Sequence, residues 1–272
     1  MFIDTHTHIF PEKIATRTVE MLRERLPKPY NVSYSDGTLN GLLESMKKAG
    51  IDKSIVLPVV TKPSQFDSIN AFAIKINGKN GIISLGGIHP DNDNIEERLE
   101  YIKSIGLKGI KLHPDYQDTF IDDEKYIAVI KKCIELSLTV VIHSGVDLGY
   151  PDLVRCTPDR VLNLIKAVYK DKSPERTDIV LAHIGANGMY KEVLEKLCSL
   201  PVAFDLSYSL LDIDKPLLLE IIKNHGAENI LFASDSPWGD QKAFKEYFEA
   251  LPLSKEEKDL ISYKNAIRIF DI

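Results

Sequence analysis

The stretch Phe2-Ile3-Asp4-Thr5-His6-Thr7-His8 has the length and composition of a β-strand, and it carries two histidines at its carboxyl end. Side chains along a strand alternate between its two faces, so we expect His6 and His8 to point to the same side. In a barrel of parallel strands that side is the interior, where two neutral imidazoles can bind one divalent metal ion. The meaning of this pair therefore depends on the remainder of the chain.

Further apolar runs resemble the first one and are separated by longer amphipathic segments. They are rich in β-branched residues and nearly continuous in apolar character, as is typical of strands buried on both faces. Strand–helix alternation repeated eight times predicts an α/β fold, the (β/α)8 or TIM barrel, which takes about 250 residues. An open doubly wound sheet is the alternative. Since no linker interrupts the pattern, we expect one domain, residues 1–272. The predicted strands are residues 2–8, 54–60, 82–89, 109–113, 139–144, 179–184, 202–207 and 230–234.

Apolar residues with helical spacing lie between these runs. The first such segment ends at Gly50, a residue favoured where helices stop, and a later one begins near Pro158. The segment of residues 16–34 is longer than a minimal connection, so we expect it to help cover the barrel mouth. The apolar helical positions are Leu39, Leu42, Leu43 and Met46; Tyr126, Ile127, Val129, Ile130 and Ile134; Leu162, Ile165, Val168 and Tyr169; and Val193, Leu194, Leu197 and Leu200.

Composition excludes several classes of function. A formal charge of −6 without a basic stripe argues against a nucleic-acid partner. No apolar run approaches the roughly 18 residues that a membrane span needs, and we expect neither a membrane partner nor a signal peptide. The cysteines, Cys133, Cys156 and Cys198, lie far apart without a CxxC pair, which suits a reducing compartment. These features favour a cytoplasmic protein that acts on a small molecule, and they leave a homodimer open.

The placement of the histidines is the main functional signal. Six of the seven histidines fall at the carboxyl ends of predicted strands, the face on which barrel enzymes build their active sites. His143, His183 and Asp235 each close an apolar strand and precede a glycine or proline by a few residues. Such groups are costly to bury alone, so each needs a partner or a metal. Imidazole and carboxylate ligands suit Zn²⁺, with Mn²⁺, Fe²⁺ and Co²⁺ as alternatives.

These motifs together resemble the amidohydrolase superfamily. The resemblance rests on the stretch from Asp4 to His8, on His143, His183 and Asp235 at three later strand ends, and on residues 263–270. That final segment, Tyr-Lys-Asn-Ala-Ile-Arg-Ile-Phe, looks like the closing helix of the amidohydrolase-2 branch of metal-dependent hydrolases and decarboxylases. The resemblance covers nearly the whole chain. It implies one divalent ion, held by His6, His8, His143 and Asp235.

The resemblance also implies catalytic roles. The metal would lower the pKa of a bound water toward neutrality. Asp235 would accept the proton of that water and pass it to the leaving group. His183, beside the metal, would polarise the substrate carbonyl or stabilise its developing negative charge.

Other strand-end residues are candidates for the substrate side. Lys111 could be a carboxylated lysine that bridges two metals, as in many binuclear relatives, or a substrate contact or a salt-bridge partner. His113 would face the substrate or support a ligand, and Arg155 and Tyr150, in the long loop after the fifth strand, could reach a substrate carboxylate. Asp205 and Ser207 share a face and could bind substrate or orient a ligand histidine.

Two histidines have structural interpretations. His89 precedes Pro90 at a strand end and resembles a loop feature of the branch, so we expect no catalytic role for it. His225 precedes Gly226 and fits the carboxyl end of a helix, where the helix dipole would favour it.

The sequence favours metal-dependent hydrolysis of a small ester, lactone or amide. The alternative is a lyase reaction, non-oxidative decarboxylation or hydration, on the same ligands. Decarboxylases of this kind need a cation for the substrate carboxylate and a well-developed insertion after the first strand, and the chain is short for that group. A non-enzymatic binding protein with an inherited fold predicts missing ligands, whereas all of the expected ones are present.

Overall fold

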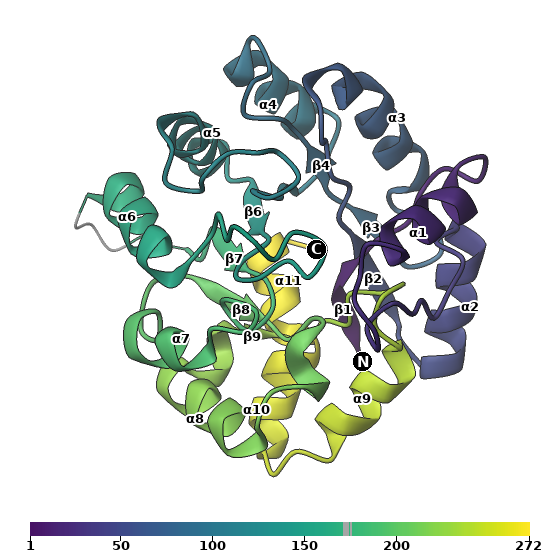
Figure 1. The fold of residues 1–272 in the computed structure, drawn as a ribbon, viewed down its shortest axis with the longest axis vertical. Helices are drawn as coiled ribbons and strands as arrows, with labels where there is room; N and C mark the ends of the chain where they lie inside the picture. Colours follow the sequence, from purple (N-terminus) through teal and green to yellow (C-terminus); the bar gives the residue numbers. More distant parts are fainter. Residues whose placement is uncertain (171–173, 175) are drawn as a thin grey trace.

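The computed structural model describes residues 1–170, 174 and 176–272. Its strands all run parallel and stand at the centre of Figure 1, with the helices in a ring around them. The strands are β1 Ile3–Thr7, β2 Lys53–Val56, β3 Ile82–Ser84, β4 Gly86–Gly87, β5 Gly109–Leu112, β6 Thr139–Ile142, β7 Ile179–Leu181, β8 Ala203–Asp205 and β9 Ile230–Leu231.

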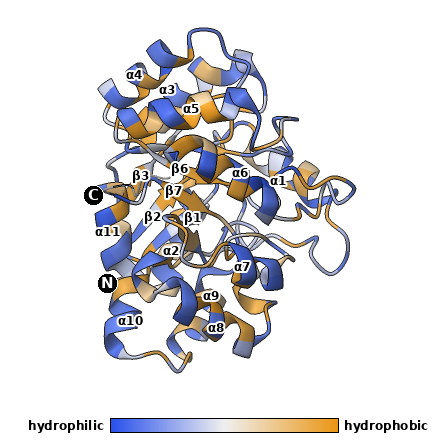
Figure 2. Cartoon of the chain, turned by 90° about the vertical axis from the view of Figure 1, so that its left-hand side faces the viewer, coloured by the Kyte–Doolittle hydropathy of each residue, from blue (hydrophilic) through white to orange (hydrophobic). Residues whose placement is uncertain are grey.

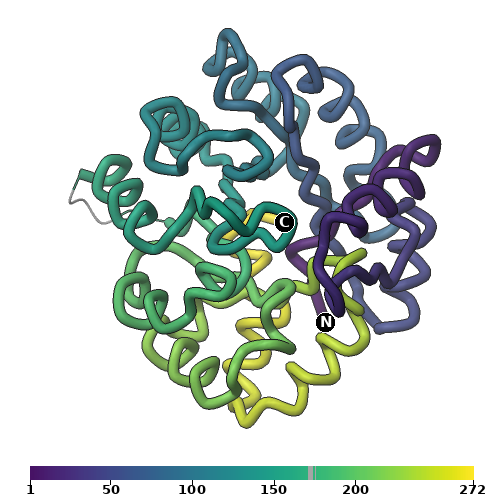
Figure 3. Tube along the Cα trace, in the orientation of Figure 1, coloured from purple at the N-terminus to yellow at the C-terminus, as the bar shows by residue number. Residues whose placement is uncertain are grey.

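Two hydrogen-bonded ladders close into a barrel. One ladder has the order β1-β2-β3 and the other runs from β4 to β9 in sequence order. Leu85 separates β3 from β4, so these two segments form the single third strand that the sequence predicts. At the other junction Thr5 N donates to Phe232 O at 3.0 Å, and Asp235 N donates to His6 O at 2.9 Å. The chain thus goes once around and returns beside its own beginning (Figure 3). The predicted (β/α)8 barrel and its eight strand positions are confirmed. The observed strands are shorter than the predicted ones.

The helices occupy the predicted crossovers. The structure ends α2 at Gly50, whose φ of +66° is the left-handed conformation that glycine adopts without strain. It ends α7 at Lys196, before the predicted positions Leu197 and Leu200, and Ser199 then has a left-handed φ of +76°, which does not continue a helix. The helices are α1 Ala15–Arg23, α2 Leu39–Ala49, α3 Phe66–Ile76, α4 Ile95–Ser104, α5 Glu124–Glu135, α6 Pro158–Tyr169, α7 Tyr190–Lys196, α8 Lys215–His225, α9 Gln241–Glu249, α10 Lys255–Asp259 and α11 Asn265–Phe270. Shorter helical segments are η1 Pro63–Gln65, η2 Ser209–Leu211, η3 Ala227–Asn229 and η4 Leu260–Lys264.

Two apolar cores hold these layers together. The larger one lies between the strands and the surrounding helices. The smaller one fills the barrel interior and continues into α11 through Ile269 and Phe270. Helix α11 therefore closes one end of the barrel, whereas α1 and long loops lie at the opposite end (Figure 2). That opposite end is where the strands finish and where the candidate site lies.

The remaining structural expectations have mixed outcomes. His225 is the last residue of α8, but burial lowers its pKa to about 4. Its ring is therefore neutral near pH 7, donates to Val202 O and stacks on Phe204, so the expected interaction of a charged ring with the helix dipole is wrong. The three cysteines are free. Within the described ranges, no helix combines the length and apolarity that crossing a membrane requires.

Candidate metal centre and active site

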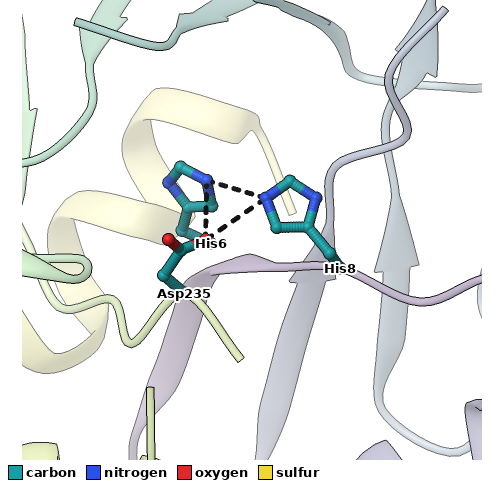
Figure 4. A group of neighbouring side chains, drawn as sticks. All are labelled: His6, His8 and Asp235. Carbon is teal, nitrogen blue, oxygen red and sulfur yellow. Dashed lines mark hydrogen bonds and ion pairs between the residues drawn. The ribbon is translucent and has the colours of Figure 1, made fainter. Parts of the chain in front are cut away.

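His6, His8 and Asp235 converge at the mouth of the barrel (Figure 4). The Nε2 atoms of His6 and His8 are 3.1 Å apart. Oδ1 of Asp235 lies 3.4 Å from Nε2 of His6 and 3.3 Å from Nε2 of His8. The side chains are only 1%, 15% and 10% exposed, respectively. Three potential ligand atoms thus lie close together at a largely buried position that could hold a metal ion.

An irregularity in β1 turns the two histidines inward. Ile3 packs in the barrel interior, but Thr7 pairs with Val56, which packs in the outer core. Strict alternation would place residues 3 and 7 on the same face, so the register shift between Asp4 and Thr7 reverses the faces. Bulges of this kind re-aim side chains next to active sites. The prediction that His6 and His8 face the interior is confirmed, although regular alternation alone would not produce it.

The hydrogen bonds of the two rings fix their tautomers. Nδ1 of His8 lies 2.8 Å from the carbonyl oxygen of Leu57, which can only accept, so Nδ1 carries the proton. Nδ1 of His6 lies 2.8 Å from Oδ2 of Asp205 and donates in the same way. Both Nε2 atoms then present lone pairs to each other and to the carboxylate of Asp235. Acceptors at this spacing repel one another, so the donor set fits a divalent cation.

Asp235 is held as a carboxylate. Burial raises its pKa, but the facing rings of His6 and His8 lower it more, and the net shift is downward. Its φ of +67° is left-handed, a conformation that aspartate and asparagine tolerate better than most residues. Behind it, burial raises the pKa of Asp4 to about 6, while hydrogen bonds from Ser234 and Gln241 limit the rise. Asp4 therefore supports the strand ends rather than lining the cavity.

His183 stands beside this triad on a strained piece of backbone. His183 and Ile184 have φ values of +61° and +57°, which are unusual for residues other than glycine, above all for a β-branched one. Such outliers concentrate at functional sites. The His183 ring centroid is 5.2 Å from that of His6. Burial is the largest cause of its lowered pKa, so the ring is neutral near pH 7.

Asp205 orients both neighbouring histidines. Besides the bond to His6, its Oδ1 accepts from the backbone N–H groups of His183 and Ser207, both at 3.0 Å. The hydroxyl of Ser207 also donates to Oδ1, and Ser207 Oγ lies 2.9 Å from Nδ1 of His183. The sequence leaves two roles open for Asp205, binding substrate or orienting a ligand histidine. This geometry supports the second role.

His143 lies next to the triad but is not part of it. Its Nδ1 is 3.0 Å from Nε2 of His183. Its ring stacks on that of His113 with centroids 4.1 Å apart, and His113 stacks on Tyr116. Asp147 approaches the free edge of His113, with Oδ2 3.4 Å from Nε2. The structure therefore brings three of the four predicted ligands together, and the fourth is in contact with His183.

Lys111 and Arg155 have different positions. The Lys111 side chain is buried, and its Nζ lies 3.3 Å from Nε2 of His6. Burial is the main reason that its pKa falls to about 8. Within the described part of the chain it forms no salt bridge, so substrate contact and carboxylation remain predictions. Arg155 pairs with Asp118 and approaches Asp115, outside the cavity lining, and its placement does not support the predicted contact with substrate.

A cavity of about 800 Å³ opens above these groups, within the range of small-molecule sites. Helix α1 and the residues around it form one wall, so the predicted covering function of residues 16–34 is confirmed. Arg25, from this wall, donates to Tyr150 at 2.6 Å from the opposite side. Apolar and aromatic lining includes Phe10, Met21, Leu22, Phe72, Tyr116, Tyr208 and Trp238.

Sequence reasoning missed several residues of this region. Asp115 lies in the turn after β5, two residues beyond His113, where the alternation of strand side chains no longer applies. Arg25 and Trp238 line the cavity from loops, and no local pattern marks them in the sequence.

Comparisons with known proteins agree with this geometry. The family model described as amidohydrolase matches residues 3–272, which is nearly the whole chain. No curated protein matches the chain.

Several solved structures are similar to the chain over nearly its whole length. A 2,6-dihydroxybenzoate decarboxylase from Rhizobium is 17% identical with a TM-score of 0.71, over 99% of this chain and 98% of that one. A 5-carboxyvanillate decarboxylase from Novosphingobium aromaticivorans, complexed with manganese and 4-hydroxy-3-methoxy-5-nitrobenzoic acid, is 16% identical with a TM-score of 0.72, over 100% and 96%. A protein described as a candidate 2-pyrone-4,6-dicarboxylic acid hydrolase from Pseudomonas putida is 16% identical with a TM-score of 0.68, over 99% and 97%.

Proposed function

The chain belongs to the amidohydrolase family, and from that premise we propose that it is a metal-dependent enzyme that decarboxylates a small, planar ring acid. His6, His8 and Asp235 would hold the ion, with His143 as the fourth ligand. Zn²⁺ and Mn²⁺ both suit this donor set, and one similar structure contains manganese. When bound, a divalent ion supplies a Lewis acid that polarises a ligand oxygen.

The observation that carries the proposal is the charge of the cavity lining. Three cationic side chains, Arg25, Lys62 and Lys111, line the cavity together with two carboxylates, Asp147 and Asp235. Three positive and two negative charges leave a net +1, to which a divalent ion adds two further positive charges. A cavity with this balance favours an anionic substrate. Lys111, buried beside His6, is the cation best placed to bind a carboxylate near the metal ligands.

The walls of the cavity suit a flat ring. Phe10, Phe72, Tyr116 and Trp238 are aromatic side chains on the lining. Aromatic groups pack well against planar rings through offset-stacked or edge-to-face contacts. A planar acid could thus place its ring between these side chains and its carboxylate against Lys111.

Two structural features favour decarboxylation over the hydrolysis that the sequence favours. The insertion after β1 covers the cavity with α1, and cations face the interior. A covered cavity and a cation for the substrate carboxylate are both expected of a decarboxylase. The similar decarboxylases align over nearly their whole length, which weakens the argument from chain length. Loss of CO₂ leaves an electron pair on the ring carbon, and that carbon must then take up a proton. Asp235 or His183, both at the ligand cluster, would first take up a proton from solvent and then deliver it to that carbon.

Hydrolysis of a lactone ring that carries carboxylates is the second candidate. The ionised carboxylate of Asp235 favours it, because a carboxylate can accept a proton from an attacking water. In this reaction His183, which carries its proton on Nδ1, would have to take up a second proton on Nε2 before it could donate to the developing oxyanion. Both reactions use an anionic, planar substrate, so the cavity alone does not separate them.

Product analysis separates the two candidates. Zn²⁺- or Mn²⁺-loaded protein is incubated with hydroxybenzoic acids and with 2-pyrone carboxylates, and chelator-treated protein serves as the control. We expect metal-dependent release of CO₂ and a ring product that has lost one carboxyl group. Ring opening without CO₂ would replace decarboxylation by hydrolysis, whereas turnover of neutral esters alone would overturn the proposed substrate class.

A further inference from the structure

Two buried polar atoms face each other behind His143. Oδ2 of Asp115 and Nε2 of His143 are 3.8 Å apart, and the two side chains are 1% and 8% exposed. In the part of the chain that the structure describes, neither atom has a hydrogen-bond partner. Buried polar atoms without partners are rare in folded proteins, so two that face each other point to a shared function.

The neighbouring hydrogen bonds define the protonation of His183. The Ser207 hydroxyl donates to Asp205, so its oxygen accepts from Nδ1 of His183. The backbone oxygen of Ser207, 3.3 Å away, also only accepts from this Nδ1. The neutral ring of His183 therefore carries its proton on Nδ1, and its Nε2 presents a lone pair to His143.

His143 can satisfy only one of its two neighbours while it is neutral. With the proton on Nδ1, it donates to His183 but turns a lone pair toward the carboxylate of Asp115. With the proton on Nε2, it directs that N–H toward Asp115, 3.8 Å away in this structure, and leaves Nδ1 free on the side of the ring that faces His183. Nδ1 lies on the side of His183, which stands beside the ligand cluster, so the second tautomer is the one that could bind a metal there.

We propose that Asp115 is a positioning residue that holds His143 in the tautomer with the proton on Nε2 and Nδ1 free for the metal. This inference rests on the metal site proposed above and adds to it a residue that acts through a ligand. Carboxylates that accept from metal-bound histidines commonly fix both the tautomer and the ring orientation.

The surroundings hold both partners in place. Oδ1 of Asp115 accepts from the backbone N–H of Arg155 at 3.3 Å, and the guanidinium of Arg155 lies 3.8 Å away. The ring of His143 stacks on His113 with an interplanar angle of 11°. An approach of roughly 1 Å between ring and carboxylate would bring the Nε2–H of His143 within hydrogen-bond distance of Asp115.

Asp115→Asn tests the proposal because it conserves shape and reverses the hydrogen bond. The asparagine amide can donate to a bare Nε2, which stabilises the tautomer that cannot bind through Nδ1. We expect the Kd for Zn²⁺ to rise about 10–100-fold, while the melting temperature without metal changes little. Asp118→Asn is the matched control, since Asp118 also pairs with Arg155 but is exposed on the surface. We expect Asp118→Asn to bind Zn²⁺ as the unmodified protein does.

Two further measurements exclude a merely structural effect. In a His143→Ala background, we expect Asp115→Asn to cause no additional loss of Zn²⁺ affinity, because both changes act through one ring. Nitrogen-15 NMR of labelled histidines, with the His143 signals assigned from their loss in His143→Ala, reports the tautomer. We expect Nε2–H in the Zn²⁺-loaded protein and Nδ1–H in Asp115→Asn.

The outcomes separate this inference from the proposed function. If the unmodified protein binds no divalent ion, the metal site itself is wrong. If that protein binds Zn²⁺ and Asp115→Asn binds it equally well, or with the same tautomer, only the role of Asp115 is overturned. An additive loss in the His143→Ala background would show that Asp115 acts by another route.

Discussion

A variant in which both His6 and His8 are replaced by alanine is expected to lose its bound metal. Each ring contributes an Nε2 lone pair to the same small space, and Asp235 and His143 together offer too few donors for a tight site. Metal analysis after dialysis should fall from about one ion per chain to essentially none. Turnover should fall with it, because the ion supplies the Lewis acid of the proposed reaction.

The folding of this variant has to be checked, because His6 also donates to the buried carboxylate of Asp205. His8→Ala alone is the safer change, since His8 is partly exposed and, apart from its contacts with His6 and Asp235, bonds to the backbone carbonyl of Leu57 rather than to a buried side chain. It should weaken metal binding and leave the circular dichroism spectrum unchanged. His89→Ala is the matched control, a strand-end histidine outside the cavity lining. A folded double variant that still holds one ion per chain would place the metal elsewhere.

The second large effect is expected from Asp235→Asn. Asparagine has nearly the same shape and tolerates the left-handed φ of +67° at this position, so the fold should persist. It cannot accept a proton as a carboxylate does. General acid–base groups contribute about 10²–10⁴-fold to rate, and we expect kcat/KM to fall by that factor. Steady-state kinetics at saturating metal would measure the loss without confusing it with weaker metal binding.

Asp212→Asn provides the comparison for this change, because Asp212 is an exposed aspartate in the loop after β8 and does not line the cavity. It should retain full activity. If Asp235→Asn retained activity within a few-fold of the unmodified protein while holding its metal, proton transfer by Asp235 would be excluded in both the decarboxylation and the hydrolysis schemes.

The fold could be predicted because its signals are local. Apolar runs that end in polar residues mark all eight strand positions, and the barrel follows from their parallel alternation with helices. The third strand shows the limit of this reasoning. Its apolar run is continuous in sequence, but the hydrogen-bonded ladder is interrupted at Leu85: β3 pairs with β2, whereas β4 pairs with β5. The composition of the run does not predict this interruption.

The candidate site could be predicted only in part. His6, His8 and Asp235 can be predicted as neighbours because the carboxyl ends of the strands meet at one face of a barrel. The bulge in β1 that points the two histidines inward depends on pairing with β2, which no local pattern records. The contact between Asp115 and His143 joins two different strand ends in the same way. Arg25 enters the cavity from a loop, where side-chain periodicity carries no information.

A crystal structure of the Zn²⁺-loaded protein, with anomalous diffraction at the zinc edge, tests the central claim most directly. We expect one anomalous peak about 2.0–2.2 Å from Nε2 of His6, Nε2 of His8 and a carboxylate oxygen of Asp235, with His143 as the fourth ligand. A second group that could hold an ion, His113, His143 and Asp147, lies nearby. Zinc bound there, with His6 and His8 unliganded, would contradict the account.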